Sequence, residues 1–253
     1  MLKAYLKYRK ARVNAHGLHS PFVFEFYNEI IKKSKTEIDT NFEELRAELL
    51  KRNTTIEFTE MGAGSRKGNP LRRSVKSIAK NAATTRKFGG LLSRLCAFYK
   101  VEKVLELGTS LGIGTAYLSK HSQKTITLEG CEPVAQLAQE NFDHLNLDHI
   151  ELRLGEFTNS LNNLAAEKPV FDLIYIDGNH QLKPTLAYFE FALNHCHNDS
   201  FIILDDIYWS AEMEQAWNKI KADDRVNVTI DLFRLGIVCI RKGQRKQNFV
   251  VKF

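Results

Sequence analysis

The feature of this sequence that most restricts its fold is a series of short apolar runs that alternate with helix-like stretches from residue 101 onward. The runs begin 22 to 29 residues apart and cover 101–108, 125–130, 149–155, 171–177 and 200–206. This spacing fits a strand, a crossover helix and the next parallel strand, and nearly continuous apolar character is typical of strands buried on both faces. The pattern therefore predicts an α/β fold with a doubly wound, Rossmann-like, mostly parallel sheet.

Two further apolar runs follow the parallel strands and end the sheet differently. They cover 226–233 and 236–242, and the gap between them is too short for a crossover helix. If these runs pair, they pair antiparallel, so we expect a C-terminal hairpin and seven strands in all. The crossover helices are expected at 113–121, 132–145, 157–166, 183–195 and 210–221.

The N-terminal part of the chain indicates helices instead. Ser20 and Pro21 are typical of a helix N-cap and first turn, and Phe22, Phe26 and Ile30 then recur at helical spacing.

Helices are also expected near 71–81 and 85–99, after an extended run that enters a Gly-rich loop at 60–64. We therefore predict two domains, a mainly helical and basic N-terminal cap or lid over 1–84 and an α/β domain over 85–253.

Charge is distributed unevenly along the chain. The formal net charge is +6, yet residues 1–100 sum to +12 and residues 101–253 to −6. The stretch 61–101 holds ten basic side chains and no acidic one. Such a stretch attracts an anionic substrate or a nucleic acid, but a basic segment packed beside an acidic domain, or a solvated helix face, gives the same pattern.

Composition excludes several classes of protein. Hydrophobic residues at 43% and charged residues at 26% are in the globular range, which excludes a fibrous or wholly disordered chain. No apolar run approaches the ~20 residues that cross a bilayer, and the N-terminus lacks the apolar core of a signal peptide. The four cysteines form no CxxC pair, so neither a disulfide framework nor a zinc cluster is expected. We expect a cytoplasmic protein without stable membrane insertion.

A glycine-rich segment follows the first parallel strand and leads directly into a helix. Glycines at this place let backbone amides approach a ligand at the carboxyl edge of the sheet, where doubly wound folds bind cofactors. The segment is not the dinucleotide GxGxxG motif, because Gly108 and Gly112 are four residues apart. Tight packing of helix on strand would also require glycines here. The candidate cofactor residues are Glu106, Gly108, Thr109, Ser110, Gly112, Gly114 and Thr115.

A second acidic residue strengthens this interpretation. Glu129 ends the second strand about twenty residues further on, where a carboxylate can accept both ribose hydroxyls of a nucleoside. Gly130 follows it, and Gly155 with Glu156 stands in the corresponding place after the third strand.

Aspartates end the fourth and fifth strands. Asp177 opens the sequence Asp-Gly-Asn-His, and Asp205 is followed by Asp206. Because parallel strands end at one edge of a sheet, we expect these three carboxylates to converge beside the glycine segment. Hard oxygen ligands suit Mg²⁺, Mn²⁺ or Ca²⁺, and such an ion would lower the pKa of a bound hydroxyl. Aspartates at strand ends also cap helices or bind a charged cofactor without metal.

Together these segments resemble class I S-adenosylmethionine-dependent methyltransferases. ELGTSLGIGT, TITLEG, LRLGEF, IYIDGNH and IILDD occur in that family's order and spacing, over about 85–253. The resemblance implies an S-adenosylmethionine-binding domain over 85–253, in which 106–114 wraps the methionine part of the cofactor. It also implies that Glu129 holds the ribose and that Gly155 and Glu156 flank the adenine.

Within the family, the chain resembles the metal-dependent catechol and caffeoyl-coenzyme A O-methyltransferases. That resemblance implies that Asp177 and Asp205 bind metal, and it places Asp206 where an asparagine is common. It places His180 where those enzymes have a catalytic lysine. A histidine there can act as general base near neutral pH, or it can be an ordinary surface residue. Gly114 stands where related enzymes often have a serine for the methionine carboxylate, and Thr115 or Ser110 are its candidate substitutes.

The expected acceptor is a hydroxyl oxygen, because Asp177 is not followed by the Pro-Pro-aromatic sequence that resembles amino-methyltransferases. The leading interpretation is methyl transfer to a small molecule, assisted by a divalent metal and a general base. The alternatives are an RNA methyltransferase that uses the basic stretch 61–101 and a non-catalytic protein that binds S-adenosylmethionine. A homodimer is compatible with each of them.

Overall fold

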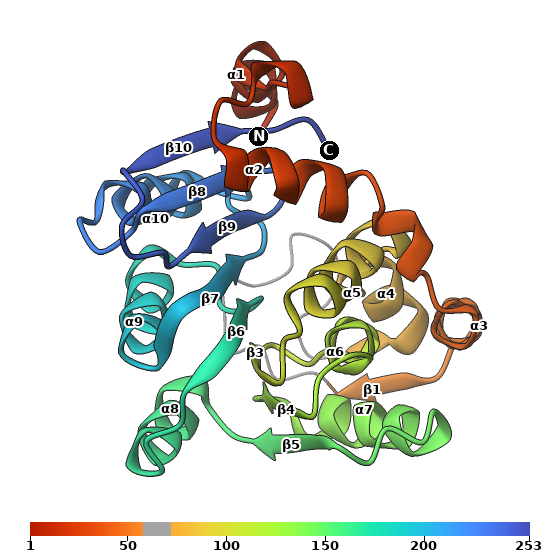
Figure 1. The fold of residues 1–253 in the computed structure, drawn as a ribbon. Coiled ribbons are helices and arrows are strands. Elements are labelled where there is room, and N and C mark those ends of the chain that lie inside the picture. Colours follow the sequence, from red (N-terminus) through yellow and green to blue (C-terminus); the bar gives the residue numbers. More distant parts are fainter. Residues whose placement is uncertain (58–71) are drawn as a thin grey trace. The chain divides into compact units, whose positions relative to one another are not determined.

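The computed structural model describes residues 1–57 and 72–253, and the predicted Gly-rich loop at 60–64 lies outside these ranges. The chain forms two compact units. We call Lys32–Glu167 the central unit, and Met1–Ile31 together with Lys168–Phe253 the terminal unit. The strands of a mostly parallel eight-stranded sheet divide between them, which confirms the predicted α/β class (Figure 1).

The central unit contains three parallel strands in the order β3-β4-β5. These are β3 (Lys103–Leu107), β4 (Lys124–Glu129) and β5 (Ile150–Leu154). As predicted, a helix follows each: α6 (Ile113–Ser119), α7 (Glu132–His144) and α8 (Phe157–Ala166). The rest of the unit is the short η3 (Ser34–Glu37), α3 (Thr40–Leu49), the antiparallel pair β1 (Thr55–Glu57) and β2 (Arg72–Ser74), α4 (Val75–Asn81) and α5 (Arg86–Tyr99).

The terminal unit contains five strands in the order β10-β8-β9-β7-β6. Strands β6 and β7 are parallel, and β9 lies antiparallel between β7 and β8. The strands are β6 (Phe171–Ile176), β7 (Cys196–Leu204), β8 (Val228–Asp231), β9 (Gly236–Cys239) and β10 (Gln247–Val250). The helical elements are α1 (Leu2–Ala11), η1 (Ala15–Gly17), α2 (Pro21–Phe26), η2 (Tyr27–Ile31), α9 (Leu182–Asn194) and α10 (Ala211–Ala222).

The predicted C-terminal hairpin is confirmed, but the predicted count of seven strands is one short. The eighth strand, β10, pairs parallel with β8. Its residues, Gln-Asn-Phe-Val, are exposed or half-buried, so they form no apolar run by which a strand is recognised. Beyond β10, the carbonyl of Val251 accepts a hydrogen bond of 2.7 Å from the hydroxyl of Tyr8 in α1, which ties the two ends of the unit together.

The predicted helix start at Ser20 is confirmed. The Ser20 hydroxyl accepts from the amide of Val23 at 3.4 Å, and Pro21 occupies the first turn. Phe22, Phe26 and Ile30 are buried, as their spacing predicts. The helix changes to a π-helical turn over η2, which the apolar spacing did not indicate.

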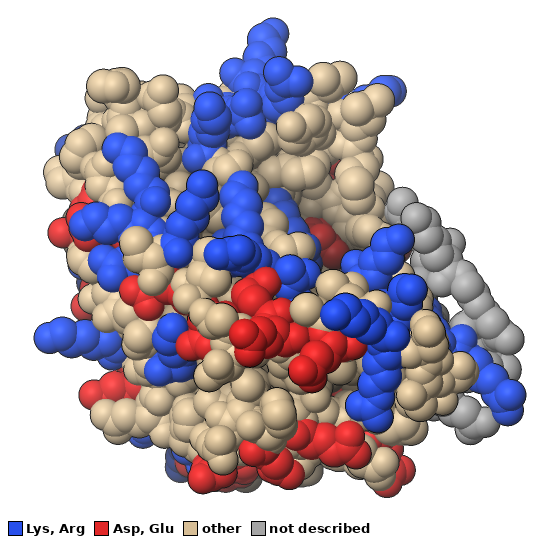
Figure 2. Space-filling model, turned by 90° about the vertical axis from the view of Figure 1, so that its right-hand side faces the viewer, with Lys and Arg blue, Asp and Glu red and all other residues tan. Residues whose placement is uncertain are grey.

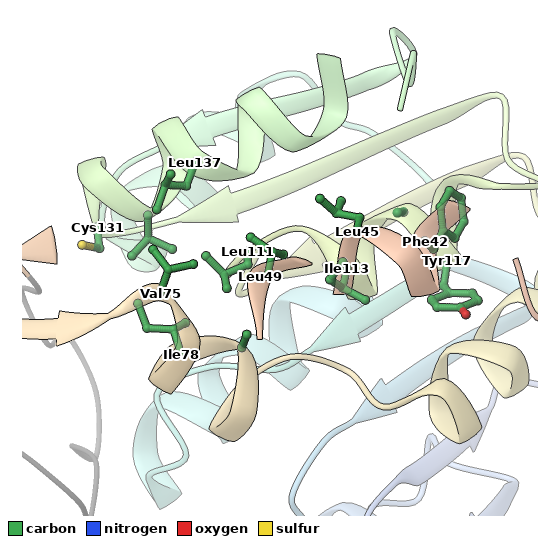
Figure 3. Close-up of a cluster of buried hydrophobic side chains, with 13 residues drawn as sticks. Phe42, Leu45, Leu49, Val75, Ile78, Leu111, Ile113, Tyr117, Cys131 and Leu137 are labelled. Carbon is green, nitrogen blue, oxygen red and sulfur yellow. The ribbon is translucent and has the colours of Figure 1, made fainter. Parts of the chain in front are cut away.

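Helices α3 and α4 belong to the core of the central unit. Leu45 and Leu49 of α3 and Ile78 of α4 lie in one cluster with Ile113 of α6, as Figure 3 shows. The core is completed by Phe42, Val75, Ala79, Leu111, Ala116, Tyr117, Cys131, Val134 and Leu137. Part of the predicted N-terminal cap thus shares a hydrophobic core with the glycine segment, whose Leu111 is buried in it. The domain boundary at residues 84 and 85 stays a prediction.

Helix α1 exposes both apolar and basic side chains. Met1, Leu2 and Leu6 are at least half exposed, and α1 contains several Lys and Arg residues and no acidic one. Basic side chains gather at the top of the view in Figure 2, at the height of α1 in Figure 1.

Two predicted absences can be compared with the structure. All four cysteines are free thiols. Within residues 1–57 and 72–253, no helix has both the length and the apolar character needed to cross a membrane.

Replacing Leu49 by Ala tests the shared core of the central unit. Leu49 is 3% exposed in the α3–α4–α6–α7 cluster. Truncating a buried leucine typically costs about 2–5 kcal/mol of unfolding free energy. Chemical denaturation of Leu49→Ala should show a loss of that size, whereas Leu6→Ala, at a helical leucine that is 54% exposed, should change stability little. Equal effects of the two substitutions would mean that α3 does not belong to this core.

Candidate functional site

The glycine segment between β3 and α6 needs glycine for conformation and for packing. Gly108 and Gly112 have φ of 108° and 82°, in the left-handed region that favours glycine. A Cβ atom at Gly112 would lie 2.5 Å from the ring of Phe142. The Gly112 amide donates to the Thr109 carbonyl at 2.9 Å, which closes the turn into α6. Gly108 and Ser110 are partly exposed, so the turn presents backbone to solvent at the end of β3.

Glu106 lies beneath this turn. Its carboxylate is 1% exposed and accepts hydrogen bonds from the hydroxyls of Thr115 and Thr127. The pKa of Glu106 is raised to about 7, because burial and the nearby Glu129 carboxylate raise it by more than the two hydroxyls lower it. Glu106 therefore titrates near neutral pH and supports the turn from below.

Two of the predicted cofactor residues support the turn from within. Thr115 is fully buried, and its hydroxyl is engaged by Glu106, so it does not offer that hydroxyl to a cofactor. A Cβ atom on Gly114 would lie 2.7 Å from the hydroxyl of Thr84 and 3.3 Å from Glu106, which leaves no room for the serine of related enzymes. In this structure Thr115 and Gly114 pack inside the turn, and their predicted contacts with a cofactor stay predictions. Thr109 is also buried, with its hydroxyl 2.6 Å from that of Thr127.

Glu129 ties the turn to the neighbouring strand. One carboxylate oxygen accepts from the Ser110 amide at 2.9 Å, and the other accepts from the Cys131 amide at 3.0 Å. Burial raises the pKa of Glu129, and these amides together with that of Gly130 lower it. The carboxylate thus reaches from the end of β4 to the glycine turn while remaining partly exposed.

The segment after β5 has a local structural role. The Gly155 amide donates to the Glu129 carbonyl at 2.8 Å, and its φ of 152° is one that side-chain-bearing residues rarely adopt. Glu156 is the N-cap of α8, where its carboxylate accepts from the Asn159 amide at 3.1 Å. Both residues are half-buried, so the predicted adenine contact stays a prediction.

In the terminal unit, the Asp205 carboxylate follows β7 and is 1% exposed. Its Oδ1 accepts from the Asp206 amide at 2.7 Å and from Arg234 Nε at 2.8 Å. Its Oδ2 accepts from Arg234 Nη2 at 2.8 Å and from the Tyr175 hydroxyl at 3.0 Å. A carboxylate has about four lone-pair positions, and these four donors use them.

The other predicted residues of this unit surround Asp205. The Tyr175 hydroxyl is 3.5 Å from Asp177 Oδ2, so it lies between the two aspartates. Nε2 of His180 is 3.7 Å from Asp177 Oδ1. Burial raises the pKa of Asp206, as does the Asp205 charge, while Arg234 and His180 lower it. The structure thus brings Asp177, His180, Asp205 and Asp206 together, while their predicted convergence with the glycine turn stays a prediction.

The turn that carries His180 is conformationally special. Asn179 and His180 have φ of 66° and 45°. The Asn179 side-chain oxygen is buried without a hydrogen-bond partner, while its nitrogen donates to Tyr188 at 3.2 Å. Left-handed backbone at residues other than glycine and an unsatisfied buried acceptor each cost free energy, and both features gather at functional sites.

The predicted metal site does not fit these residues. Asp205 has no lone pair left for an ion, and the Arg234 guanidinium would repel one. In the described part of the chain, no group of three His, Cys, Asp or Glu side chains is arranged to hold a metal. The assignment of Asp177, Asp205 and Asp206 as metal ligands is therefore not supported.

Sequence reasoning missed Arg234 and Asp231. Asp231 ends β8, and its carboxylate accepts from the Tyr208 hydroxyl at 2.6 Å and the Trp217 indole at 3.2 Å. Trp217 is 1% exposed, so its ring packs in the core of this unit. No pattern in the sequence indicated Arg234. β9 pairs antiparallel with β7, with Gly236 opposite Leu204, and this pairing places the residues just before Gly236 beside Asp205.

Comparison with protein families gives one match. Residues 105–207 match a family described as a methyltransferase domain. A curated relative, protein-L-isoaspartate O-methyltransferase 2 of Geotalea uraniireducens, is 34% identical over 86 residues, which are 34% of this chain and 38% of that protein. The chain spans between 25% and 59% of the length of the curated relatives it matches.

Solved structures give broader matches. The O-methyltransferase of Bacillus cereus in complex with SAH is 25% identical, covers 63% of this chain and 83% of that chain, and superposes with a TM-score of 0.56. The SAH-bound methyltransferase PaMTH1 of Podospora anserina covers 89% of this chain and 100% of that chain with a TM-score of 0.62, and its 15% identity shows the fold alone. The resemblance to class I S-adenosylmethionine-dependent methyltransferases is confirmed.

Glu106 makes stability depend on pH in a defined direction. Its pKa in the folded chain, about 7, exceeds that of an unfolded glutamate, so folding favours the protonated acid. The free energy of unfolding should fall as pH rises from about 4.5 to about 7, by up to about 3 kcal/mol from this group. Denaturation between pH 4.5 and 8 should show a flatter profile for Glu106→Gln, and Glu140→Gln, at an exposed glutamate on α7, should keep the wild-type profile. Parallel profiles for all three proteins would contradict this role of Glu106.

Proposed function

Since the chain has the class I S-adenosylmethionine-dependent methyltransferase fold and carries a methyltransferase domain over 105–207, we propose that it transfers a methyl group from S-adenosylmethionine to a hydroxyl oxygen of a small molecule. One observation carries the proposal: Glu129 joins the end of β4 to the glycine turn through the Ser110 amide. This arrangement places a partly exposed carboxylate beside the glycine turn at the ends of two parallel strands.

The central unit has residues that fit the cofactor. Gly108 and Ser110 present backbone for the methionine part, and Glu129 offers its remaining lone pairs to the ribose hydroxyls. S-adenosylmethionine, when bound, supplies a methyl group on a positively charged sulfur.

The terminal unit supplies the proposed base. His180 is 23% exposed, and its Nε2 faces Asp177 Oδ1 at 3.7 Å. A neighbouring carboxylate stabilises the imidazolium that forms when the ring takes a proton from the acceptor hydroxyl. Asp177 orients the ring. The O-methyltransferase of Bacillus cereus supports oxygen as the acceptor atom.

A second candidate is methylation of RNA, which the basic stretch 61–101 favours; its described part begins at Arg72. Binding of RNA that weakens steeply with salt would support this candidate, because neutralising phosphates releases counterions. No binding at low salt would remove it. The third alternative, a cofactor-binding protein without catalysis, predicts S-adenosylmethionine binding with no turnover. The homodimer and the cytoplasmic location stay predictions.

Glu129→Ala should weaken S-adenosylmethionine binding roughly tenfold to a hundredfold, because hydrogen bonds to a charged group contribute about 1.5–3 kcal/mol. Isothermal titration calorimetry with S-adenosylmethionine and with SAH measures this directly. Glu140→Ala, on the exposed side of α7, is the matched control and should bind as wild type. Unchanged affinity in a folded Glu129→Ala variant would place the cofactor elsewhere.

His180→Ala should lower turnover about 100-fold or more if the imidazole is the general base. The assay is SAH formation from S-adenosylmethionine with a library of small hydroxylated acceptors. His149→Ala is the control. His149 lies in the central unit, where its ring is hydrogen-bonded to the Ser119 carbonyl. A rate that does not change on removal of His180 would assign this histidine to the surface.

A further inference from the structure

We infer that the guanidinium of Arg234 permanently takes the place that a divalent metal would hold at this cluster of aspartates, so that the reaction runs without a metal ion. The statement about the reaction rests on the proposed function. The statement about the cation concerns the terminal unit alone and can be tested separately. Arg234 is thereby a positioning residue for Asp205.

The first argument is the occupancy of Asp205. Arg234 contacts both oxygens of this carboxylate through Nε and Nη2, each at 2.8 Å. Such a two-point contact with a planar guanidinium is the strongest pairing that arginine makes with a carboxylate. With the Asp206 amide and the Tyr175 hydroxyl on the remaining positions, a metal ion would have to displace a buried donor to reach Asp205.

The second argument is charge. A buried aspartate needs a compensating positive charge, and here arginine supplies it. Asp206 Oδ1 is a further 3.7 Å from Arg234 Nε, so one guanidinium serves two carboxylates. Arginine stays protonated at every physiological pH, so this charge does not depend on metal supply.

The third argument is that Arg234 sits on a rigid support. It lies in the short turn between β8 and β9, where the Leu232 amide donates to the Leu235 carbonyl at 2.9 Å. The Asp231 carboxylate accepts from the Phe233 amide at 2.8 Å, and the Arg234 carbonyl accepts from the Ile207 amide at 3.2 Å. The turn is thus joined both to the end of β8 and to the segment that follows Asp205, which fixes the guanidinium against the carboxylate.

Removing the arginine should create the metal site that the wild-type chain lacks. Without Arg234, Asp205 would regain two lone pairs and face Asp177 across the Tyr175 hydroxyl. Carboxylate oxygens of this kind are the ligands that Mn²⁺ and Mg²⁺ prefer. A gain of binding on loss of a residue is a result that a purely structural role of Arg234 would not produce.

The experiment is Mn²⁺ binding followed by electron paramagnetic resonance at pH 8, with Mn²⁺ alone as the probe. The wild-type chain should show no specific site. Arg234→Ala should bind Mn²⁺ at least tenfold more tightly than wild type, and the double variant Asp205→Asn with Arg234→Ala should lose this gain. Arg225→Ala is the matched control, because Arg225 also bridges two carboxylates, Glu190 and Asp223, but at the exposed surface.

Three outcomes would overturn the inference. They are a Mn²⁺ site in the wild-type chain that Asp205→Asn abolishes, no gain in a folded Arg234→Ala variant, and an equal gain in Arg225→Ala. If Arg234→Ala does not fold, Mn²⁺ titrations of the wild-type chain and of the single variant Asp205→Asn decide the question. Failure of methyl transfer would leave these binding results unaffected. For any acceptor found by screening, turnover should be the same with and without a chelator.

Discussion

The structure depends on how it neutralises carboxylates that are buried at or beside the ends of its strands. Glu106, Asp205 and Asp231 are each at most 2% exposed. An unpaired charge in such a place costs several kcal/mol, so each carboxylate must be protonated, hydrogen-bonded or paired with a cation. The chain uses a different solution for each. Glu106 accepts hydrogen bonds from threonine hydroxyls and has a raised pKa, which favours its protonated form. Asp205 is paired with an arginine. Asp231 receives a phenol, an indole and a backbone amide.

These solutions distribute the chemical roles. Glu106 is buried and supports the turn whose exposed backbone is proposed to receive the cofactor. Four hydrogen-bond donors occupy Asp205, whereas Asp177 and His180 are more exposed and are the groups proposed to meet an acceptor.

The sequence predicted most of the fold because periodicity is a local property. Apolar runs separated by helix-length segments identified β3 to β9 and the five helices between them. A strand that is buried on both faces has apolar residues at consecutive positions, and such a run is visible in the sequence. β10 has no such apolar run, because its side chains are exposed or half-buried. Among the site residues, Gly108, Gly112 and Glu129 followed from their places at strand ends. The packing roles of Gly114 and Thr115 did not, because they depend on Thr84 and on Glu106 as neighbours in space.

The sequence by itself determined the class of fold, the order of the parallel strands along the chain and the residue types at their carboxyl ends, because these follow from short-range patterns of burial and turn formation. Only the tertiary structure decided which partner each buried carboxylate has. Arg234 is 29 residues from Asp205 in the chain, and the antiparallel pairing of β9 with β7 brings them within 2.8 Å. Electrostatic compensation acts through space, so the presence of a metal-like group of aspartates in a sequence does not establish which cation neutralises it.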